Sequence, residues 1–96
     1  MDRAIIAREL AFRTSRSGGK GGQHVNKVET RVELLFSFPA SAGLSAAEKA
    51  LAVSRLATYL DSEQRMHLFS DRFRTQLANK RAVTERFFAL LEPALV

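Results

Sequence analysis

The sequence predicts a small two-layer α+β domain whose elements follow the order β-β-α-β-α. Three short segments have the composition or alternation of strands, and two longer segments carry apolar residues at helical spacing. A long glycine-rich loop separates the first two strands. We expect a small mixed sheet with both helices packed on one face, which leaves the other face free to meet a partner.

The first two strands are predicted by apolar and polar residues that alternate with a period of two. Leu10, Phe12 and Thr14 alternate with more polar neighbours, and a clearer alternation runs over Thr30–Phe38. Pro39 stops the second strand because proline has no amide hydrogen to donate to a neighbouring strand. We expect these two strands to pair antiparallel, with the glycine-rich loop as their connection.

The first helix is predicted to begin near Leu44. Ser45 and Glu48 have the spacing of a capping box, in which each side chain accepts a hydrogen bond from the other residue's free amide. Residues at helical spacing form the predicted buried face, and their small size suggests that the helix lies close on the sheet. They are Ala46, Ala50, Val53, Ala57 and Leu60, with Leu56 beside them.

The second half of the chain is predicted to hold the third strand and the last helix. Asp61–Arg65 reads as a turn, Met66–Ser70 as a strand and Thr75–Leu91 as a helix, which Glu92–Pro93 ends. The broad apolar arc of this helix comprises Leu77, Val83, Phe87, Phe88, Leu90 and Leu91.

Composition limits the classes of function. Ninety-six residues make one domain, and the absence of cysteine excludes disulfides and thiolate metal sites. No apolar run approaches membrane-spanning length and the N-terminus lacks the apolar region of a signal peptide, so we expect a cytoplasmic protein with no membrane contact. A net charge of +5 and a pI of about 10.5 are consistent with a polyanionic partner such as nucleic acid, and the open alternative is a solvated basic surface, which is common in small domains.

Four of the five glycines lie in the stretch SRSGGKGGQHVN, which covers residues 15–26. The stretch fits neither a phosphate-binding P-loop nor a dinucleotide-binding fingerprint, and the two histidines form no metal-ligand pattern. It offers exposed backbone, a neutral amide at Gln23 and positive charge at Arg16, Lys20 and Lys27. This suits a loop inserted among phosphates, and the open alternative is a mobile hairpin connection with basic residues there by chance.

Gly21-Gly22-Gln23 resembles the GGQ motif of class I peptide-chain release factors. The whole run from Arg16 to Val32 carries the resemblance, and Ser70-Asp71-Arg72, Thr75-Gln76 and Asn79-Lys80 extend it over most of the chain. The sequence is most similar to the short, codon-independent peptidyl-tRNA hydrolases that rescue stalled ribosomes, which implies a single GGQ domain over residues 1–96.

The sequence departs from the family pattern at two places. Lys20 stands where the family commonly has proline. The lysine lacks the stiffness of proline and adds a positive charge. Short rescue members usually end in a long Lys/Arg-rich tail, whereas this sequence ends in Pro93-Ala94-Leu95-Val96 without one.

The resemblance implies hydrolysis of the peptidyl-tRNA ester on the ribosome, in translation termination or rescue, without a metal or cofactor. Gly21, Gly22 and Gln23 are the implied catalytic residues. The backbone N–H of Gln23 would bind the departing oxygen or the oxyanion, and its side chain would place water. The implied partners of a monomeric protein are the rRNA of the large subunit and peptidyl-tRNA.

Further residues are implied to contact RNA phosphates or to shape the loop, and Asn26 and Thr30 are expected to brace it. The expected RNA-binding residues are Arg16, Ser17, Lys20, His24, Asn26, Lys27, Arg31, Arg72, Arg74, Lys80 and Arg81. The alternative reading is a non-catalytic rRNA- or tRNA-binding module with the same fold, because fold alone does not determine function.

Overall fold

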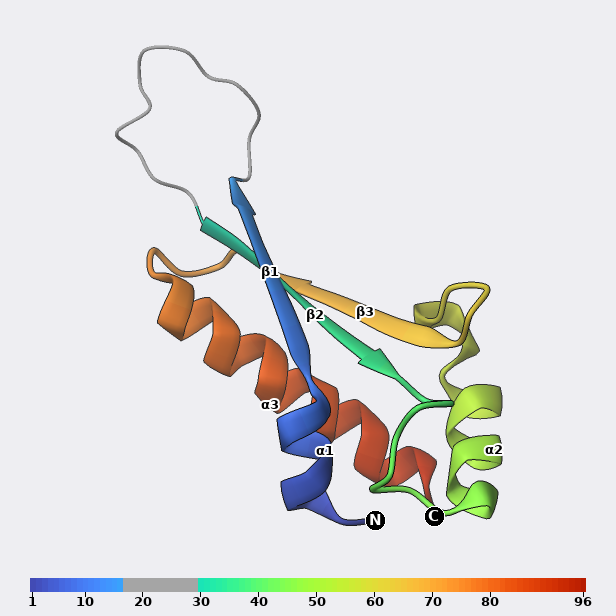
Figure 1. The fold of residues 1–96 in the computed structure, drawn as a ribbon. Helices are drawn as coiled ribbons and strands as arrows, with labels where there is room; N and C mark the ends of the chain where they lie inside the picture. The colour runs from blue at the N-terminus through green and yellow to red at the C-terminus, as the bar shows by residue number, and fades with distance from the viewer. Residues whose placement is uncertain (17–29) are drawn as a thin grey trace.

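The computed structural model describes residues 1–16 and 30–96 and confirms the α+β class (Figure 1). The predicted glycine-rich loop lies outside the described residues, apart from Ser15 and Arg16, which end β1. None of the described helices is long and apolar enough to cross a membrane. In chain order the elements are α1 (Arg3–Glu9), β1 (Ala11–Arg16), β2 (Thr30–Ser37), α2 (Ala46–Arg55), the 3-10 helix η2 (Ala57–Tyr59), β3 (Arg65–Ser70) and α3 (Gln76–Ala94).

The three strands form an antiparallel sheet in the order β1-β2-β3, so the expected mixed sheet is wrong. The register places Phe12 opposite Leu34 and Leu34 opposite Leu68, so these residues share one face. A parallel pair would need a connection that crosses the whole sheet. Here α2 and η2 lie beyond the end of the sheet, so β3 starts near the end of β2 and runs back beside it (Figure 1).

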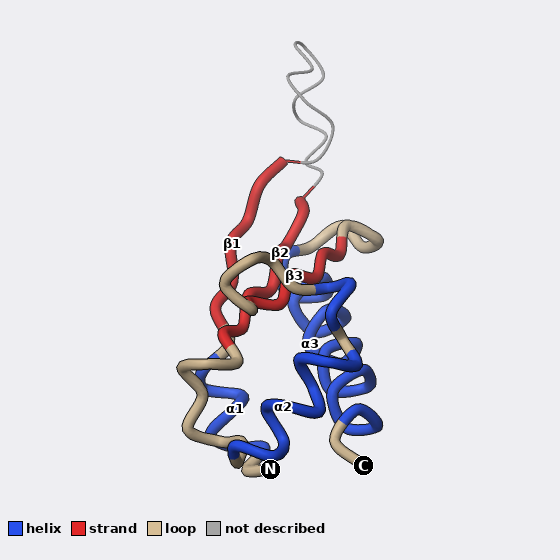
Figure 2. The backbone as a smooth tube through the Cα atoms, turned by 90° about the vertical axis from the view of Figure 1, so that its right-hand side faces the viewer, coloured by secondary structure: helices blue, strands red, loops and turns tan. Residues whose placement is uncertain are grey.

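The core lies between the sheet and α3, which packs on one side of the three strands (Figure 2). The predicted alternation of β2 is confirmed, because Val32, Leu34 and Phe36 are buried. Aromatic rings meet at the centre of this layer: the ring centroids of Phe36 and Phe87 lie 5.1 Å apart in a tilted arrangement. Such pairs stabilise the fold beyond the burial of their area.

The capping box that opens α2 is confirmed, and the predicted buried face of this helix is correct in part. The Ser45 hydroxyl accepts from the Glu48 amide at 3.1 Å, and the Glu48 carboxylate accepts from the Ser45 amide at 2.9 Å. As predicted, Leu56 is buried and Val53 and Leu60 pack against the core. The three predicted alanines, Ala46, Ala50 and Ala57, are exposed, and Ala52 is the buried alanine instead. The helix packs against the C-terminal half of α3 rather than on the sheet (Figures 1 and 2).

The N-terminal helix α1 was not predicted. It has seven residues and only two large apolar ones, of which Ile6 is fully buried. Its N-cap Asp2 accepts from the Ile5 amide at 3.1 Å, a signal that the sequence did contain. The fifth glycine, Gly43, lets the chain pass close to this helix, because a Cβ there would lie 2.6 Å from Ile6 Cγ1.

The last helix runs to Ala94, so the prediction that Glu92–Pro93 ends it is wrong. Pro93 lies in the final turn, which is closed by the amides of Leu95 and Val96 through bonds to Glu92 and Pro93 carbonyls. These bonds do not use the proline nitrogen, so proline is tolerated there. At the other end of the predicted arc, Leu77 is 58% exposed, because two residues before Asn79 it falls on the opposite face of the helix from the buried side.

The uncovered side of the sheet, here called the open face, carries a chain of charged side chains across all three strands. The Arg13 guanidinium of β1 donates to Glu33 of β2 at 2.8 Å, and Glu33 contacts Nδ1 of His67 in β3 at 2.8 Å. The Asp61 carboxylate lies 2.8 Å from the other ring nitrogen and also pairs with Arg65. The histidine is therefore held between two carboxylates.

This arrangement shifts the pKa values of its three titratable members in ways that favour the charged forms. Hydrogen bonds to Glu33 and Asp61 raise the pKa of His67. Hydrogen bonding to His67 lowers the pKa of Asp61. Partial burial acts to raise the pKa of Glu33, but hydrogen bonds from His67 and Arg13 outweigh it and lower that pKa. The imidazolium form of His67 is thus stabilised by folding.

We predict that replacing His67 with glutamine reduces the dependence of stability on pH above neutrality. Because the folded pKa of His67 is raised, its contribution is complete below its unfolded pKa of about 6.5 and is lost as the pH rises through the folded value. The free energy of unfolding should be measured by chemical denaturation at pH 6 and pH 9 for both proteins. An equal decline in the wild type and in His67→Gln would contradict the prediction.

Candidate functional site

The glycine-rich segment begins and ends at neighbouring positions at one end of the sheet. Arg16, the last residue of β1, is the register partner of Thr30, the first residue of β2. Both chain termini lie at the opposite end of the molecule, together with α1 and α2 (Figure 1). The two residues that flank positions 17–29 therefore lie side by side, at the end of the sheet away from the termini.

Most of the predicted catalytic and RNA-binding residues in this segment lie outside the described residues. They are Ser17, Lys20, Gly21, Gly22, Gln23, His24, Asn26 and Lys27. Of Arg16 only the backbone, at the end of β1, is described. The remaining candidates, from Arg31 onward, are placed by the structure and are considered below.

A single buried amide, that of Asn79 in α3, joins the segments at this end of the sheet. Its side chain is fully buried. The oxygen Oδ1 accepts from the Ser70 hydroxyl at 2.9 Å and from the Phe73 amide at 3.0 Å. The nitrogen Nδ2 donates to the Phe73 carbonyl at 2.9 Å and to the Thr30 carbonyl at 3.2 Å. The amide thus satisfies its main donors and acceptors within the protein.

These bonds connect the first residue of β2, the last residue of β3 and the turn that leads into α3. Thr30 adds a further bond, since its hydroxyl donates to the Arg74 carbonyl at 3.4 Å. This contact joins Thr30 to the turn before α3, and the expectation that Thr30 braces the loop stays a prediction because the loop lies outside the described residues. Because Thr30 directly follows the glycine-rich segment, Asn79 fixes one of its two attachment points to the body of the domain.

The role of Asn79 was missed by sequence reasoning, although a signal for it was present. Asn79, Val83, Phe87 and Leu91 recur every four residues, which places them on one stripe of the helix. The other three are buried apolar residues. A polar residue in line with such a stripe is expected to be buried, and it must then have hydrogen-bond partners.

Cationic residues occur on three elements that meet near this end of the sheet: β2, the turn after β3 and the first turns of α3. Figure 1 shows these elements close together there. The basic cluster comprises Arg31, Arg72, Arg74, Lys80 and Arg81, all predicted to bind RNA. Arg31 is half-buried and the other four are exposed. Three of the charges lie over aromatic rings: Arg31 over Phe69 at 4.1 Å, Arg72 over Phe73 at 5.2 Å and Lys80 over Phe12 at 4.7 Å.

Most acidic residues in the described part of the chain have partners away from the basic cluster, although Asp71 and Glu85 lie near Arg72 and Arg81. Within residues 1–16 and 30–96, no member of the cluster forms an ion pair. In the same part of the chain, the acids with hydrogen-bond or ion-pair partners are Asp2, Glu9, Glu33, Glu48, Asp61, Glu63 and Glu92. An aromatic ring orients a cation while leaving its charge free to attract phosphate. This end of the domain is therefore suited to a polyanion.

The described residues show no arrangement for nucleophilic catalysis. Among them His67 is the one histidine, and both of its ring nitrogens are engaged by carboxylates on the open face. A histidine with both ring nitrogens bonded to carboxylates has no free nitrogen to accept a proton from a nucleophile. The described part of the chain thus serves as a frame and as a charged surface.

We predict that Asn79→Ala lowers the free energy of unfolding by about 3 kcal/mol. The truncation leaves the Ser70 hydroxyl and the Phe73 and Thr30 backbone groups without partners, and each unsatisfied buried group costs roughly 1–3 kcal/mol. Urea denaturation measures the change. Gln76→Ala, which removes an exposed amide from the same helix, is the control and should change stability by less than about 0.5 kcal/mol. Equal effects of the two changes would show that the Asn79 network does not hold the fold together.

The comparison with known families agrees with this geometry. The family model of the RF-1 domain matches residues 1–95, which is nearly the whole of the 96-residue chain. The match spans the paired strands, the glycine-rich segment between them and the turn and helix that carry Asn79. The chain therefore belongs to the RF-1 domain family, the GGQ domain of class I peptide-chain release factors.

Proposed function

We propose that this chain hydrolyses the ester bond of peptidyl-tRNA on the ribosome, independently of a codon, as in the rescue of stalled ribosomes. The observation that carries the proposal is the intact Gly21-Gly22-Gln23 motif in a chain that matches the release-factor family over 95 residues. Family membership supports a release-factor-like module that interacts with the ribosome and peptidyl-tRNA. Action without a codon goes beyond what family membership supports, and it is proposed here.

The frame supports this function by fixing where the GGQ segment leaves the domain. The two strands that carry it are paired up to Arg16 and Thr30, and Asn79 ties Thr30 to α3. Fixed attachment points reduce the conformational freedom that must be lost when the segment enters a binding site. The basic cluster beside it provides attraction to rRNA phosphates at the same end of the molecule.

The proposed chemistry uses positioning and electrostatics rather than a protein base. The Gln23 amide side chain is almost non-basic, so it would orient water against the ester without accepting its proton. The Gln23 backbone N–H would stabilise the developing negative charge, an interaction that is worth a few kcal/mol in a site from which water is excluded. Gly21 and Gly22 would allow the backbone to approach rRNA closely. A cytoplasmic location follows from a ribosomal substrate.

We predict that Gly22→Ala abolishes peptide release while leaving the melting temperature within about 2 °C of the wild type. The added methyl group would obstruct close approach to RNA, and residue 22 lies outside the frame described above. The measurement is release of labelled peptide from ribosomes that carry peptidyl-tRNA. Gly18→Ala, a matched change in the same segment but outside the motif, should retain most of the activity.

Two results would contradict the proposed function. Release by Gly22→Ala at the wild-type rate would show that the motif does not act in hydrolysis. Tight binding of the wild type to ribosomes without any release would favour the second reading, a non-catalytic RNA-binding module with the same fold.

A further inference from the structure

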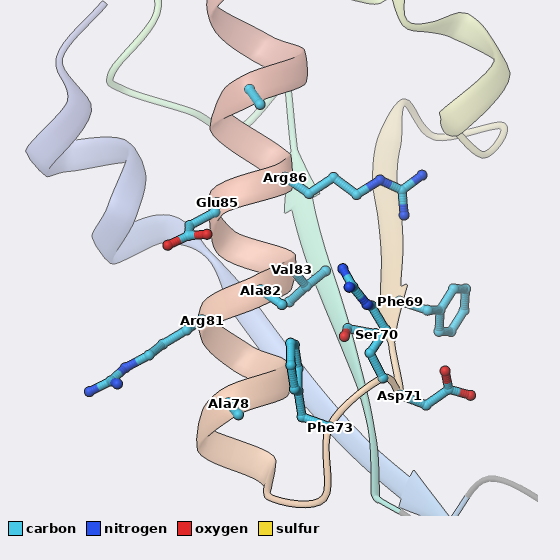
Figure 3. A pocket seen from close by; sticks show the side chains of 12 residues that line it. Phe69, Ser70, Asp71, Phe73, Ala78, Arg81, Ala82, Val83, Glu85 and Arg86 are labelled. Atoms are coloured by element: carbon cyan, nitrogen blue, oxygen red, sulfur yellow. The ribbon is translucent and has the colours of Figure 1, made fainter.

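A groove lies between the end of β3 and the first half of α3, next to the Asn79 network. Its volume is about 870 Å³, within the range of sites that hold small ligands. The helix contributes small side chains, among them Ala78 and Ala82, which leave room beside the strand (Figure 3). Its rim includes Ser70 and Phe73, both of which are hydrogen-bonded to Asn79. The groove is therefore built on the same anchor as the glycine-rich segment.

Two phenylalanines that line this groove are exposed, and Phe73 is the one whose ring lies beside α3. Phe73 is 44% exposed and Phe69 is 43% exposed, among the most exposed large apolar residues of the described chain. In Figure 3 the Phe73 ring stands between α3 and the turn that follows β3. The Arg72 guanidinium lies over this ring at 5.2 Å. An aromatic ring and a guanidinium plane are the two protein surfaces on which nucleic-acid bases stack.

The charges that face the groove are positive. Arg86 projects from α3 across the groove toward β3 in Figure 3, and Arg72 comes from the turn. Neither arginine forms an ion pair within residues 1–16 and 30–96. Asp71 and Glu85 also border the groove, but in Figure 3 their carboxylates point away from the space between strand and helix.

We propose that this groove binds an unpaired RNA nucleotide, with its base stacked on Phe73 and Arg72 and its phosphates held by Arg72 and Arg86. The inference rests on the proposed function in so far as that function supplies a ribosomal RNA surface. The charge of the groove selects RNA over a neutral peptide, because each nucleotide brings a negative charge as well as a flat ring. In a helix both faces of a paired base are covered by its stacked neighbours, so the bound nucleotide must be unpaired and unstacked.

The test measures binding of the 96-residue protein to a fluorescent ten-nucleotide oligoadenylate by anisotropy at several salt concentrations. Phe73→Ala should weaken binding at least fivefold, and Phe73→Tyr, which keeps the ring, should stay within twofold of the wild type. Arg72→Gln and Arg86→Gln should each reduce the slope of log K against log salt by about 0.7. Arg8→Gln, which removes an exposed charge from α1, is the matched control and should leave the slope unchanged.

Three outcomes would overturn the proposal. Phe73→Ala could bind like the wild type, or Arg72→Gln and Arg86→Gln could behave like the Arg8→Gln control. In a competition arm, a hexaglutamate peptide could displace the oligoadenylate through the same arginines more effectively than unlabelled oligoadenylate does, which would identify an acidic peptide as the occupant. If Phe73→Ala lost its fold, the two arginine variants would still decide the matter.

A release assay on ribosomes separates this inference from the proposed function. Phe73→Ala should raise the protein concentration needed for half-maximal release and leave the saturating rate unchanged. A wild type that releases no peptide, together with the expected oligoadenylate results, would refute the proposed function and leave the groove assignment standing. If the wild type released peptide normally, and Phe73→Ala bound oligoadenylate as tightly as the wild type, only the groove assignment would be refuted.

Discussion

The structure depends on one buried amide, that of Asn79, at the end of the sheet where the glycine-rich segment is attached. Burying an amide is favourable only when its donors and acceptors have partners, and here β2, β3 and the following turn supply them. The bonds in turn determine where Thr30 and Phe73 lie. One side chain therefore fixes both the residue that follows the GGQ segment, Thr30, and a residue that lines the adjacent groove, Phe73.

This anchor divides the domain into two ends with different chemistry. At one end, the aromatic core around Phe36 and Phe87 and the helices α1 and α2 supply most of the apolar burial. At the other, the Asn79 hydrogen bonds join the strands to α3, and the basic cluster forms no ion pair within the described residues. A domain of this size tolerates a polar, charged end because the opposite end is well packed. The division allows a small fold to carry exposed charge at one end and still remain folded.

The sequence predicted the strands better than the helices, for a physical reason. Alternation in Thr30–Phe38 has only one interpretation, because successive strand residues face opposite sides. The alanines of α2 gave no such constraint, and the helix turned Ala52 rather than Ala50 toward the core. Whether β3 runs parallel or antiparallel to β2 depends on the position of α2. No local sequence pattern predicts that position.

The candidate site was predictable where a motif or a charge marked it, and not where tertiary contacts made it. The basic residues and the GGQ motif could be read directly from the sequence. The hydrogen bonds of Asn79 and the exposure of Phe73 could not, since both depend on segments that are distant in the chain. Asn79 stood on a visible apolar stripe, but its partners Thr30 and Ser70 became identifiable only once the sheet was assembled.

The central claim is that the chain supplies a rigid frame and a positioned motif, while the ribosome supplies the rest of the catalytic site. The most direct test compares hydrolysis of the same labelled peptidyl-tRNA free in solution and bound to ribosomes, at equal protein concentration. The account predicts rapid release on ribosomes and no measurable acceleration in solution, because the described residues hold no base and nucleophile of their own. Equal rates in the two settings would contradict it and would show that the chain contains a complete hydrolytic site.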